Sequence, residues 1–454
     1  MTVPLPGHIA DSTISSQPPT GSPVPTDYQG LSIEWSMVEH WFGTSAATVV
    51  VPFVNVLSSL RRTDTTGALR IGGNSQDGYR WNPSGSTAGN QLFAGTITPG
   101  LVDAVFEVAR RAGWRVIFGL NLASDDPAMA AALAQYVRGT DTTGQLLGFE
   151  LGNEPNGYLT TTGAYMERIG RYVAALDASP LTVGVPITGP AISENADVAY
   201  AAALWGAYST RMPVVTWHDY ANSPNLGSLL ATVKIDQLGQ RITAMDGAVG
   251  AGNSRMDEGN SVGSGGIDGV SNVAGAGCWL IDAMLAAAFR GQRGWNTHSW
   301  DGFHYPAEGR TCWYTPFVVR NGQVSPRPPF YAMALFKFAP GRRFVGVQTS
   351  NATGQLVRTW ALRDPSARTY AFVINKGGTG KAGTVGVTGP RAGTAFLNLL
   401  ASGGCNGKDP LIEGVRLPAN GAYSWTGRAL APVSGTTRFE FTLPECSIAL
   451  LSLP

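Results

Sequence analysis

Between residues 30 and 338, short apolar stretches alternate with longer stretches in which apolar residues recur at helical spacing. This alternation is typical of βαβ units and a parallel sheet. The pattern predicts eight strands, at residues 30–35, 68–74, 115–122, 146–153, 181–188, 214–220, 254–258 and 294–300. Helix patterns between them include residues 101–112, 127–137, 163–176 and 277–289. Eight strand–helix units predict an α/β fold, a closed (β/α)8 TIM barrel.

The alternative fold is a doubly wound open sheet. Sheets of that kind usually carry a glycine fingerprint or a phosphate-binding loop between a strand and the next helix. Neither motif follows any of the predicted strands. The closed barrel is therefore the favoured architecture.

The pattern changes after residue 338. Helical spacing disappears, and strand-like runs at residues 369–375, 383–387, 438–443 and 447–451 are separated by Gly, Pro and Asn, which is typical of a β-sandwich. We expect a barrel domain over residues 30–338 and a β-sandwich domain with a structural role over residues 339–454. Residues 1–29 form an N-terminal segment, rich at first in Ser, Thr, Pro and Gly, that acts as a linker, joins the β-sandwich or is the mature end of a secreted chain.

Charge and hydropathy narrow the choice of partner. Charged residues make up 14% of the chain and the formal net charge is +1, which removes the electrostatic basis for binding nucleic acid or an anionic membrane. No apolar run approaches the roughly 20 residues of a membrane helix. The N-terminus lacks a basic and apolar signal sequence, so a secreted location after signal removal is favoured, with a cytoplasmic one as the alternative. The sequence makes no prediction of the oligomeric state.

The four cysteines show no close metal-type spacing, so we expect no metal site among them. Their separations allow one bridge between Cys278 and Cys312 and another between Cys405 and Cys446, which would suit an oxidising compartment. The alternative is four buried thiols, because free cysteine is commonly buried.

An apolar strand pattern ends in Asn153 and Glu154, within the stretch GFELGNEPN at residues 148–156. Residues at this point of a barrel strand lie at the C-terminal face, where barrel enzymes carry out their chemistry. The amide of Asn153 can hydrogen-bond a substrate hydroxyl while the carboxyl group of Glu154 transfers a proton. The alternative is an N-cap and turn before a helix, since Asn, Pro and Gly favour turns.

Glu258 supplies a second carboxyl group, at the end of the seventh predicted strand in the stretch RMDEG. The fourth and seventh strands of a closed barrel lie across the pocket, so Glu154 and Glu258 can converge. Such a pair hydrolyses a glycosidic bond, with retention when the carboxyl groups are ~5–5.5 Å apart and with inversion at ~6.5–9.5 Å. Asp257 is the competing carboxylate, and strand alternation is expected to place it on the opposite face of the sheet.

Four motifs follow one another along the barrel region: LRIGGN at residues 69–74, LGNEPN at residues 151–156, VTWHDY at residues 215–220, and Glu258 followed by GSGG at residues 263–266. Together they resemble glycoside hydrolase family 79, the β-glucuronidase and heparanase family of the retaining barrel clan. The resemblance implies that Glu154 is the acid/base and Glu258 the nucleophile of a double displacement through a glycosyl-enzyme. It also implies that Asn153 binds the sugar 2-hydroxyl and that Tyr220 donates a hydrogen bond to Glu258.

Three further polar residues stand at or near predicted strand ends. Glu34 and Asn74 occupy the ends of the first two strands, where similar enzymes bind ring hydroxyls, although family members usually have Asp at the first position. The alternatives are an arginine partner for Glu34 and a turn residue for Asn74. His218 is either a substrate-binding residue or a hydrogen-bonding residue behind the site.

The chain departs from the family at Gly263, five residues after the expected nucleophile, where family glucuronidases tend to carry a tyrosine near the sugar carboxylate. The N–H groups of Gly265 and Gly266 are expected to form an anion-binding nest. Tyr314 resembles the other tyrosine of that site. His298, near the end of the eighth predicted strand, is expected either to fill the gap or to indicate a different group at C5 of the sugar.

These residues lead to three hypotheses. The first is a retaining exo-β-glucuronidase that releases terminal glucuronic acid from a glycoside. The second is a β-glucosidase-like or disaccharide-releasing enzyme with altered C5/C6 specificity, motivated by Gly263. The third is a non-catalytic carbohydrate-binding protein, which the presence of both glutamates disfavours. An endo-acting enzyme on a sulfated polymer is disfavoured because no Lys/Arg cluster lies near Asn74, Asn153 or Gly263. No cofactor is expected.

Overall fold

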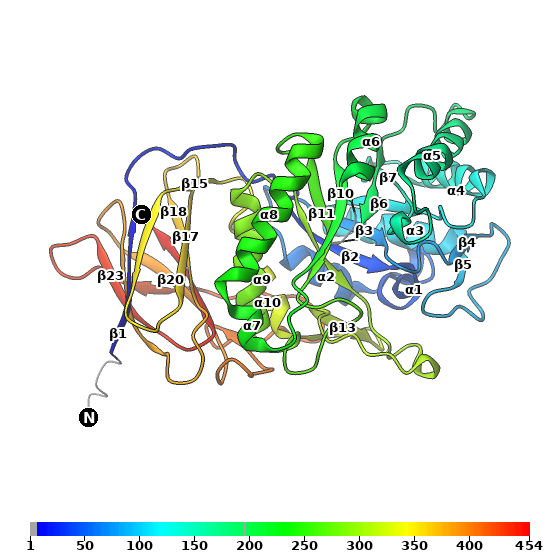
Figure 1. Cartoon of the computed structure of the whole chain (residues 1–454). Helices are drawn as coiled ribbons and strands as arrows, with labels where there is room; N and C mark the ends of the chain where they lie inside the picture. Colours follow the sequence, from blue (N-terminus) through cyan, green and yellow to red (C-terminus); the bar gives the residue numbers. More distant parts are fainter. Residues whose placement is uncertain (1–6, 194–196) are drawn as a thin grey trace.

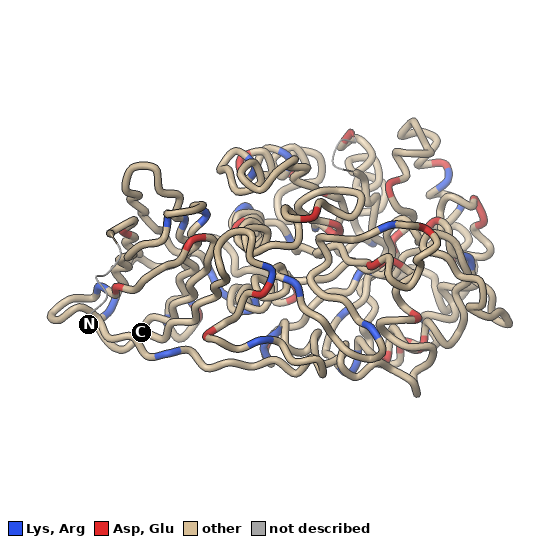
Figure 2. Tube along the Cα trace, turned by 90° about the horizontal axis from the view of Figure 1, so that it is seen from below, with Lys and Arg blue, Asp and Glu red and all other residues tan. Residues whose placement is uncertain are grey.

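The computed structural model describes residues 7–193 and 197–454 of the 454-residue chain. Figure 1 shows one part in which helices surround a parallel sheet and, beside it, a part made mainly of strands. Acidic and basic residues are interspersed over both parts (Figure 2). Among the described residues, no helix has the length and apolar character needed to cross a membrane.

A parallel sheet closes into a barrel with eight strand positions. Each strand pairs in parallel with its neighbours, and the last strand pairs in parallel with the first. The fifth position is shared by two short strands in succession, so the sheet contains nine strands. The predicted TIM barrel is therefore confirmed. Its strands are β2 (Gln29–Glu34), β3 (Gly67–Gly72), β6 (Trp114–Leu120), β7 (Leu146–Leu151), β8 (Ile187–Thr188), β9 (Pro190–Ile192), β10 (Val215–Tyr220), β11 (Ser254–Asn260) and β12 (Trp295–Ser299).

The fifth strand position differs from the prediction at residues 181–188. Leu181 and Val183 alternate like a strand, but both are 58% exposed and belong to a turn in which the N–H of Val183 donates to the carbonyl of Ser179. Only the last two residues of the predicted strand, Ile187 and Thr188, form a strand, β8, which pairs with β7, and β9 follows it and pairs with β10. The local apolar pattern was misleading because this turn buries the polar Thr182, which donates to the carbonyl of Leu176, and exposes the apolar residues on either side.

Helices cover the outside of the barrel (Figure 1). The four predicted helices are confirmed to within three residues at each end. Two begin with side-chain caps, since Asp126 accepts the N–H of Met129 at 3.0 Å and Thr161 accepts the N–H of Ala164 at 3.2 Å. The main helices are α2 (Val51–Ser59), α3 (Pro99–Ala112), α4 (Pro127–Thr140), α5 (Thr162–Asp177), α6 (Ala199–Tyr208), α7 (Leu226–Leu230), α8 (Thr232–Val249), α9 (Ala274–Phe289) and α10 (Pro328–Phe336).

Two sheets form the predicted C-terminal β-sandwich. One has the order β16-β1-β19-β23 and the other β15-β17-β18-β24-β20-β21, with β22 beside β20. Apolar side chains from both sheets, such as Val387, Phe439 and Leu451, pack in one core. The strands are β1 (His8–Ile14), β15 (Arg343–Val345), β16 (Val347–Asn351), β17 (Val357–Arg363), β18 (Thr369–Asn375), β19 (Gly383–Thr388), β20 (Ala395–Ala401), β21 (Leu411–Ile412), β22 (Arg428–Leu430), β23 (Arg438–Leu443) and β24 (Ser447–Leu453).

The N-terminal strand β1 lies within the β-sandwich. It pairs antiparallel with β16 and parallel with β19, and its residues Ile9 and Ile14 are buried in the sandwich core. The chain therefore starts its described part in the sandwich, crosses to β2 of the barrel and returns after α10 (Figure 1).

Helix α9 joins the two parts of the molecule. Almost every residue of α9 is buried, because one side faces the barrel and another faces the sandwich. Asp282 in this helix accepts a hydrogen bond from Nε1 of Trp360 at 2.8 Å and lies 2.7 Å from Nζ of Lys376 and 3.3 Å from Nε of Arg358. A buried carboxylate is thus paired with a cation from β17 and with one from the residue after β18.

The cysteines divide into two kinds. Cys405 and Cys446 form a disulfide, as predicted. Cys278 in α9 and Cys312 are buried free thiols. The predicted bridge between Cys278 and Cys312 is therefore wrong, and the alternative prediction of buried thiols holds for this pair. Burial raises the pKa of both thiols to about 12, which makes them poor nucleophiles.

Candidate active site

The C-terminal ends of the barrel strands surround a cavity of about 260 Å³. This is the face of a barrel on which active sites are built. Most of the predicted site residues line the cavity, although they come from six different strand positions or the turns after them: Glu34, Asn74, Glu154, Tyr220, Glu258 and His298.

Glu154 reaches the cavity through a tight turn after β7. Two residues of the turn have positive φ, since Gly152 has φ +86° and Glu154 itself has φ +44°. A Cβ atom at Gly152 would lie 2.8 Å from Leu122, so glycine is needed there. The N–H of Glu154 donates to the carbonyl of Ala191 at 2.9 Å. Glu154 precedes a short 3₁₀ helix (Pro155–Gly157) without capping it, so its carboxyl group, which is 33% exposed, is free to face the cavity.

Glu258 is held in its ionised form. Its side chain is only 7% exposed, and its carboxylate lies 3.0 Å from Nδ1 of His218, 2.8 Å from Nδ1 of His298 and 3.3 Å from a guanidinium nitrogen of Arg70. Burial by itself would raise the pKa of Glu258. The two imidazole groups outweigh burial and hold the pKa well below its usual range.

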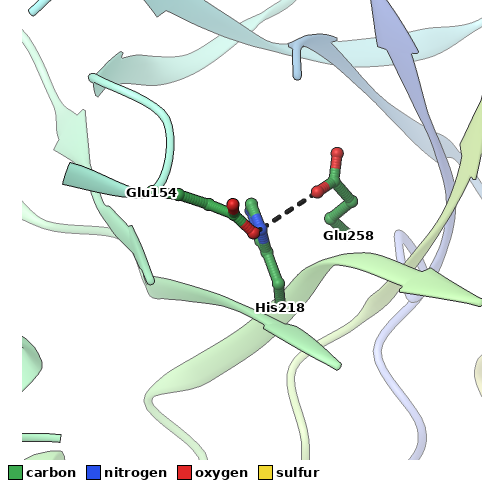
Figure 3. A group of neighbouring side chains, drawn as sticks. All are labelled: Glu154, His218 and Glu258. Atoms are coloured by element: carbon green, nitrogen blue, oxygen red, sulfur yellow. Dashed lines mark hydrogen bonds and ion pairs between the residues drawn. The ribbon is translucent and has the colours of Figure 1, made fainter. Parts of the chain in front are cut away.

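His218 lies between the two glutamates (Figure 3). Its Nδ1 atom is 2.9 Å from Oε1 of Glu154 and 3.0 Å from Oε2 of Glu258. Burial opposes a charge on the ring, but Glu258 and Asp257 outweigh it and raise the pKa of His218 well above the usual range. The ring is therefore a cation that contacts both carboxyl groups.

The same three residues are the strongest candidates for a metal site in the described part of the chain. One donor atom from each of Glu154, His218 and Glu258 can be chosen so that all lie within 4.8 Å of one another. A metal ligand must be deprotonated, however, and the raised pKa of His218 works against that. The arrangement suits proton transfer better than metal binding.

Arg70 organises the floor of the site, and the sequence analysis gave it no role. It lies in β3, is fully buried, and bonds the carboxylate of Glu150 at 2.5 Å and Oδ1 of Asn153 at 2.8 Å, besides its contact with Glu258. Burial would lower the pKa of Arg70, but the surrounding carboxylates outweigh it and raise the pKa. A charged residue inside an apolar strand was the available signal, since such a residue needs buried partners.

Asn153, Asn74 and Glu34 form a connected polar row. Nδ2 of Asn153 donates to Oδ1 of Asn74 at 3.2 Å, and the N–H of Asn74 donates to Glu34 at 3.1 Å. Glu34 also accepts the N–H of Ser75 at 2.7 Å and lies 3.4 Å from Nε2 of His298. In the described residues Glu34 has no arginine partner, so that alternative is wrong.

Asp257 lies on the inner side of the barrel, contrary to the expectation from strand alternation. Its carboxylate is 3.4 Å from Nε of Arg70 and 3.8 Å from Nε2 of His218, both of which also approach Glu258. The pairing of β10 with β11 is irregular at this point, because Trp217 pairs with Met256 and the next residue, His218, pairs with Glu258. The irregularity leaves Asp257 unpaired and breaks the two-residue period. Asp257 does not line the cavity.

Tyr220 and Tyr314 lie side by side in the cavity wall, with ring centroids 6.1 Å apart. The described residues show no hydrogen bond from Tyr220 to Glu258, whose carboxylate lies within 3.3 Å of the two imidazoles and Arg70. The hydroxyl of Tyr314 accepts a hydrogen bond from Nε1 of Trp300 at 2.9 Å.

The glycine loop after β11 differs from the predicted nest. The N–H of Gly266 donates to the carbonyl of Gly263 at 3.1 Å and is therefore used within the loop. Gly263 and Ser264 line the cavity, whereas Gly265 and Gly266 do not. Glycine is still required at Gly265, since φ is +95° there and a Cβ atom would lie 2.7 Å from a backbone oxygen of the 310–313 segment.

Comparison with known proteins shows the fold. The chain matches no protein-family model and no curated protein. It is similar to the solved structure of a 4-O-α-L-rhamnosyl-β-D-glucuronidase from Fusarium oxysporum 12S, with a TM-score of 0.74, 20% identity, and coverage of 98% of this chain and 100% of that one. A GH51 arabinofuranosidase from Xanthomonas axonopodis pv. citri has a TM-score of 0.73 at 15% identity, covering 98% and 100%. A GH39 enzyme from the same organism has a TM-score of 0.61 at 13% identity, covering 99% and 97%. Over 98–99% of its length, the chain shares the fold of these glycoside hydrolases.

Proposed function

We propose that this protein is a retaining exo-β-glycosidase, and specifically a β-glucuronidase that releases terminal glucuronic acid. The observation that carries the proposal is the meeting of Glu154 and Glu258, from β7 and β11, with an oxygen of each within 4.8 Å. A short separation of this kind fits a retaining pair, for which ~5–5.5 Å is usual, better than an inverting pair at ~6.5–9.5 Å.

The environments of the two carboxyl groups suit different roles. Ionised Glu258 attacks the anomeric carbon, and the bond from that carbon to the leaving oxygen breaks as the oxygen takes the proton of Glu154. Glu154, now a carboxylate, removes a proton from water, which attacks the same carbon and releases Glu258. The His218 cation, 2.9 Å from Glu154 and 3.0 Å from Glu258, stabilises whichever carboxylate carries the charge.

The size of the cavity and the structural likeness support an exo-acting enzyme on an acidic sugar. The cavity of about 260 Å³ is slightly smaller than typical ligand pockets of ~300–1,000 Å³, which favours a terminal sugar over a polymer segment. The similar Fusarium structure is of a glucuronidase in complex with Rha-GlcA.

A second candidate is a β-glucosidase-like or disaccharide-releasing enzyme. Gly263 stands where a carboxylate-binding tyrosine would be expected from the family resemblance, and the N–H of Gly266 is engaged within its loop. A non-catalytic carbohydrate-binding protein is disfavoured, since the cavity contains both glutamates.

Matched chromogenic substrates test the proposal. We expect p-nitrophenyl β-glucuronide to exceed the matched β-glucoside by at least about 100-fold in kcat/KM, which corresponds to ~2.7 kcal/mol. Equal or better activity on the glucoside would reject the proposal that the protein is a glucuronidase. A preference for the 4-O-rhamnosyl glucuronide over the unsubstituted one would indicate a disaccharide-releasing enzyme. A folded protein without activity on any of the three would reject the glycosidase.

A further inference from the structure

Two loops outside the barrel strands contribute to the rim of the active-site cavity. The loop between β4 (Tyr79–Trp81) and β5 (Gly95–Ile97) carries Phe93, and the segment after β12 carries Arg310, and both residues line the cavity. The two loops are joined, since the carboxylate of Glu308 accepts the N–H of Leu92 at 2.7 Å. The guanidinium carbon of Arg310 lies 5.0 Å from the centre of the Phe93 ring.

The charged side chains that line the cavity differ in whether they have a partner. Glu34, Glu154 and Glu258 each contact an imidazole. Arg310 is the one lysine or arginine among the described lining residues, and within the described chain its guanidinium makes no ion pair or hydrogen bond. Its cation–π contact with Phe93 uses none of the N–H donors in a hydrogen bond, so they are available to a ligand.

The backbone around Arg310 is held firmly beside the glycine loop. The N–H of Trp313 donates to the carbonyl of Gly265 at 2.5 Å. Gly302 packs so closely that a Cβ atom there would lie 1.8 Å from the carbonyl oxygen of Arg310. The glycine loop therefore supports the segment that presents Arg310 to the cavity.

We propose that Arg310 binds the carboxylate of the acidic sugar and thereby selects uronic acids over neutral sugars, an inference that rests on the proposed glycosidase function. The imidazoles of the site are already paired with its glutamates, so Arg310 is the lining cation left to pair with a carboxylate that enters the cavity. A guanidinium is well suited, because it can donate two parallel hydrogen bonds to the two carboxylate oxygens. Arg310 would then bind the sugar carboxylate, a role that the sequence analysis assigned to the N–H groups of Gly265 and Gly266.

The test compares Arg310→Gln and Arg310→Lys with the wild-type enzyme on p-nitrophenyl β-glucuronide and β-glucoside. We expect Arg310→Gln to lower kcat/KM on the glucuronide by about 10- to 100-fold and to change it less than about threefold on the glucoside, with Arg310→Lys between. Arg320→Gln is the matched control. Arg320 also stacks on an aromatic ring, that of Phe303 at 3.7 Å, but does not line the cavity. We expect this control to behave as wild type on both substrates.

Two results would overturn the inference while leaving the proposed function intact. One is an unchanged ratio of glucuronide to glucoside activity in Arg310→Gln, and the other is an equal loss on both substrates, which would make Arg310 only a loop-stabilising residue. If the wild-type enzyme does not cleave the glucuronide, the proposed function fails, and calorimetric titration with D-glucuronate and D-glucose decides the inference separately. Weaker binding of glucuronate alone by Arg310→Gln supports it, whereas equal binding by wild type and variant rejects it.

Discussion

The carboxyl group of Asp77 accepts a hydrogen bond from the backbone N–H of Asn153 at 3.0 Å. Asp77 follows β3, whereas Asn153 begins the turn that presents Glu154. The same carboxyl group accepts the hydroxyl of Tyr158 at 2.8 Å and the N–H of Leu122 at 2.8 Å. A residue that does not line the cavity thus fixes the strained turn beneath the expected acid/base.

Asp77→Asn tests this positioning role. An amide keeps one acceptor oxygen and places an N–H₂ group against the remaining N–H donors, so the turn should loosen. We expect kcat to fall by about tenfold or more with a smaller change in KM, because loss of position affects the reaction more than binding. Asp103→Asn is the control, since Asp103 also accepts a tyrosine hydroxyl, that of Tyr136 at 3.0 Å, in α3 away from the cavity. A variant with normal kcat and reduced stability would show that Asp77 serves the fold alone.

Substitution of the two glutamates tests their assigned roles. Glu258→Gln should abolish turnover of every substrate, whereas Glu154→Gln should still allow glycosylation by nitrophenyl glycosides, whose leaving group needs little protonation. Azide should rescue Glu154→Ala and yield a β-glycosyl azide, identified by NMR, because azide needs no general base. An inverted α-glycosyl azide from Glu154→Ala, together with a β-glycosyl azide from Glu258→Ala, would reverse the assignment.

His298 should make the free energy of unfolding decrease as the pH rises into the alkaline range. Burial alone would lower the pKa of its ring, but Glu258 at 2.8 Å and Glu34 at 3.4 Å outweigh burial and raise the pKa to about 9. The unfolded value is ~6.5, so the stabilising contribution is complete below that pH and is lost as the pH rises through 9.

The measurement is the free energy of unfolding of wild type and His298→Gln in denaturant between pH 6 and pH 10. The difference in the free energy of unfolding between the two proteins should decrease by at most ~3 kcal/mol as the pH rises over this range. A difference that stays constant with pH would show that His298 does not carry the bound proton.

Asp282 should be essential for the attachment of the barrel to the β-sandwich. Asp282→Ala leaves the buried ammonium of Lys376, 2.7 Å away, without its partner, and we expect the free energy of unfolding to fall by ~3–5 kcal/mol. The double variant Asp282→Leu with Lys376→Met removes both charges and should recover most of the loss. Chemical denaturation measures both effects. A single variant as stable as wild type would contradict the prediction.

The barrel and the convergence of Glu154 and Glu258 could be predicted from the sequence because they depend on local patterns. Apolar runs define the strands, and neighbouring strands in a parallel barrel follow one another along the chain, so strand ends meet at one face. The stretch GFELGNEPN carries its own turn, including the positive φ of Gly152. Four of the sandwich strands, β18, β19, β23 and β24, were predicted at their observed positions, since Gly, Pro and Asn separate them, whereas strands such as β17 and β20 were not named.

Tertiary contacts decided the features that local patterns misrepresent. The exposed turn at Leu181 shows the same alternation as a strand, and only burial against the barrel separates the two. Asp257 faces inward because an irregular pairing with β10 interrupts the two-residue period. Arg310 reaches the cavity because the segment after β12 packs against the loop that carries Phe93, and these residues are more than 200 positions apart in the sequence. The sequence by itself determined the strands and the carboxyl groups at their ends, because both follow from neighbouring residues. Only the tertiary structure decided the partners of those groups, because hydrogen bonds and ion pairs between distant segments depend on how the whole chain packs.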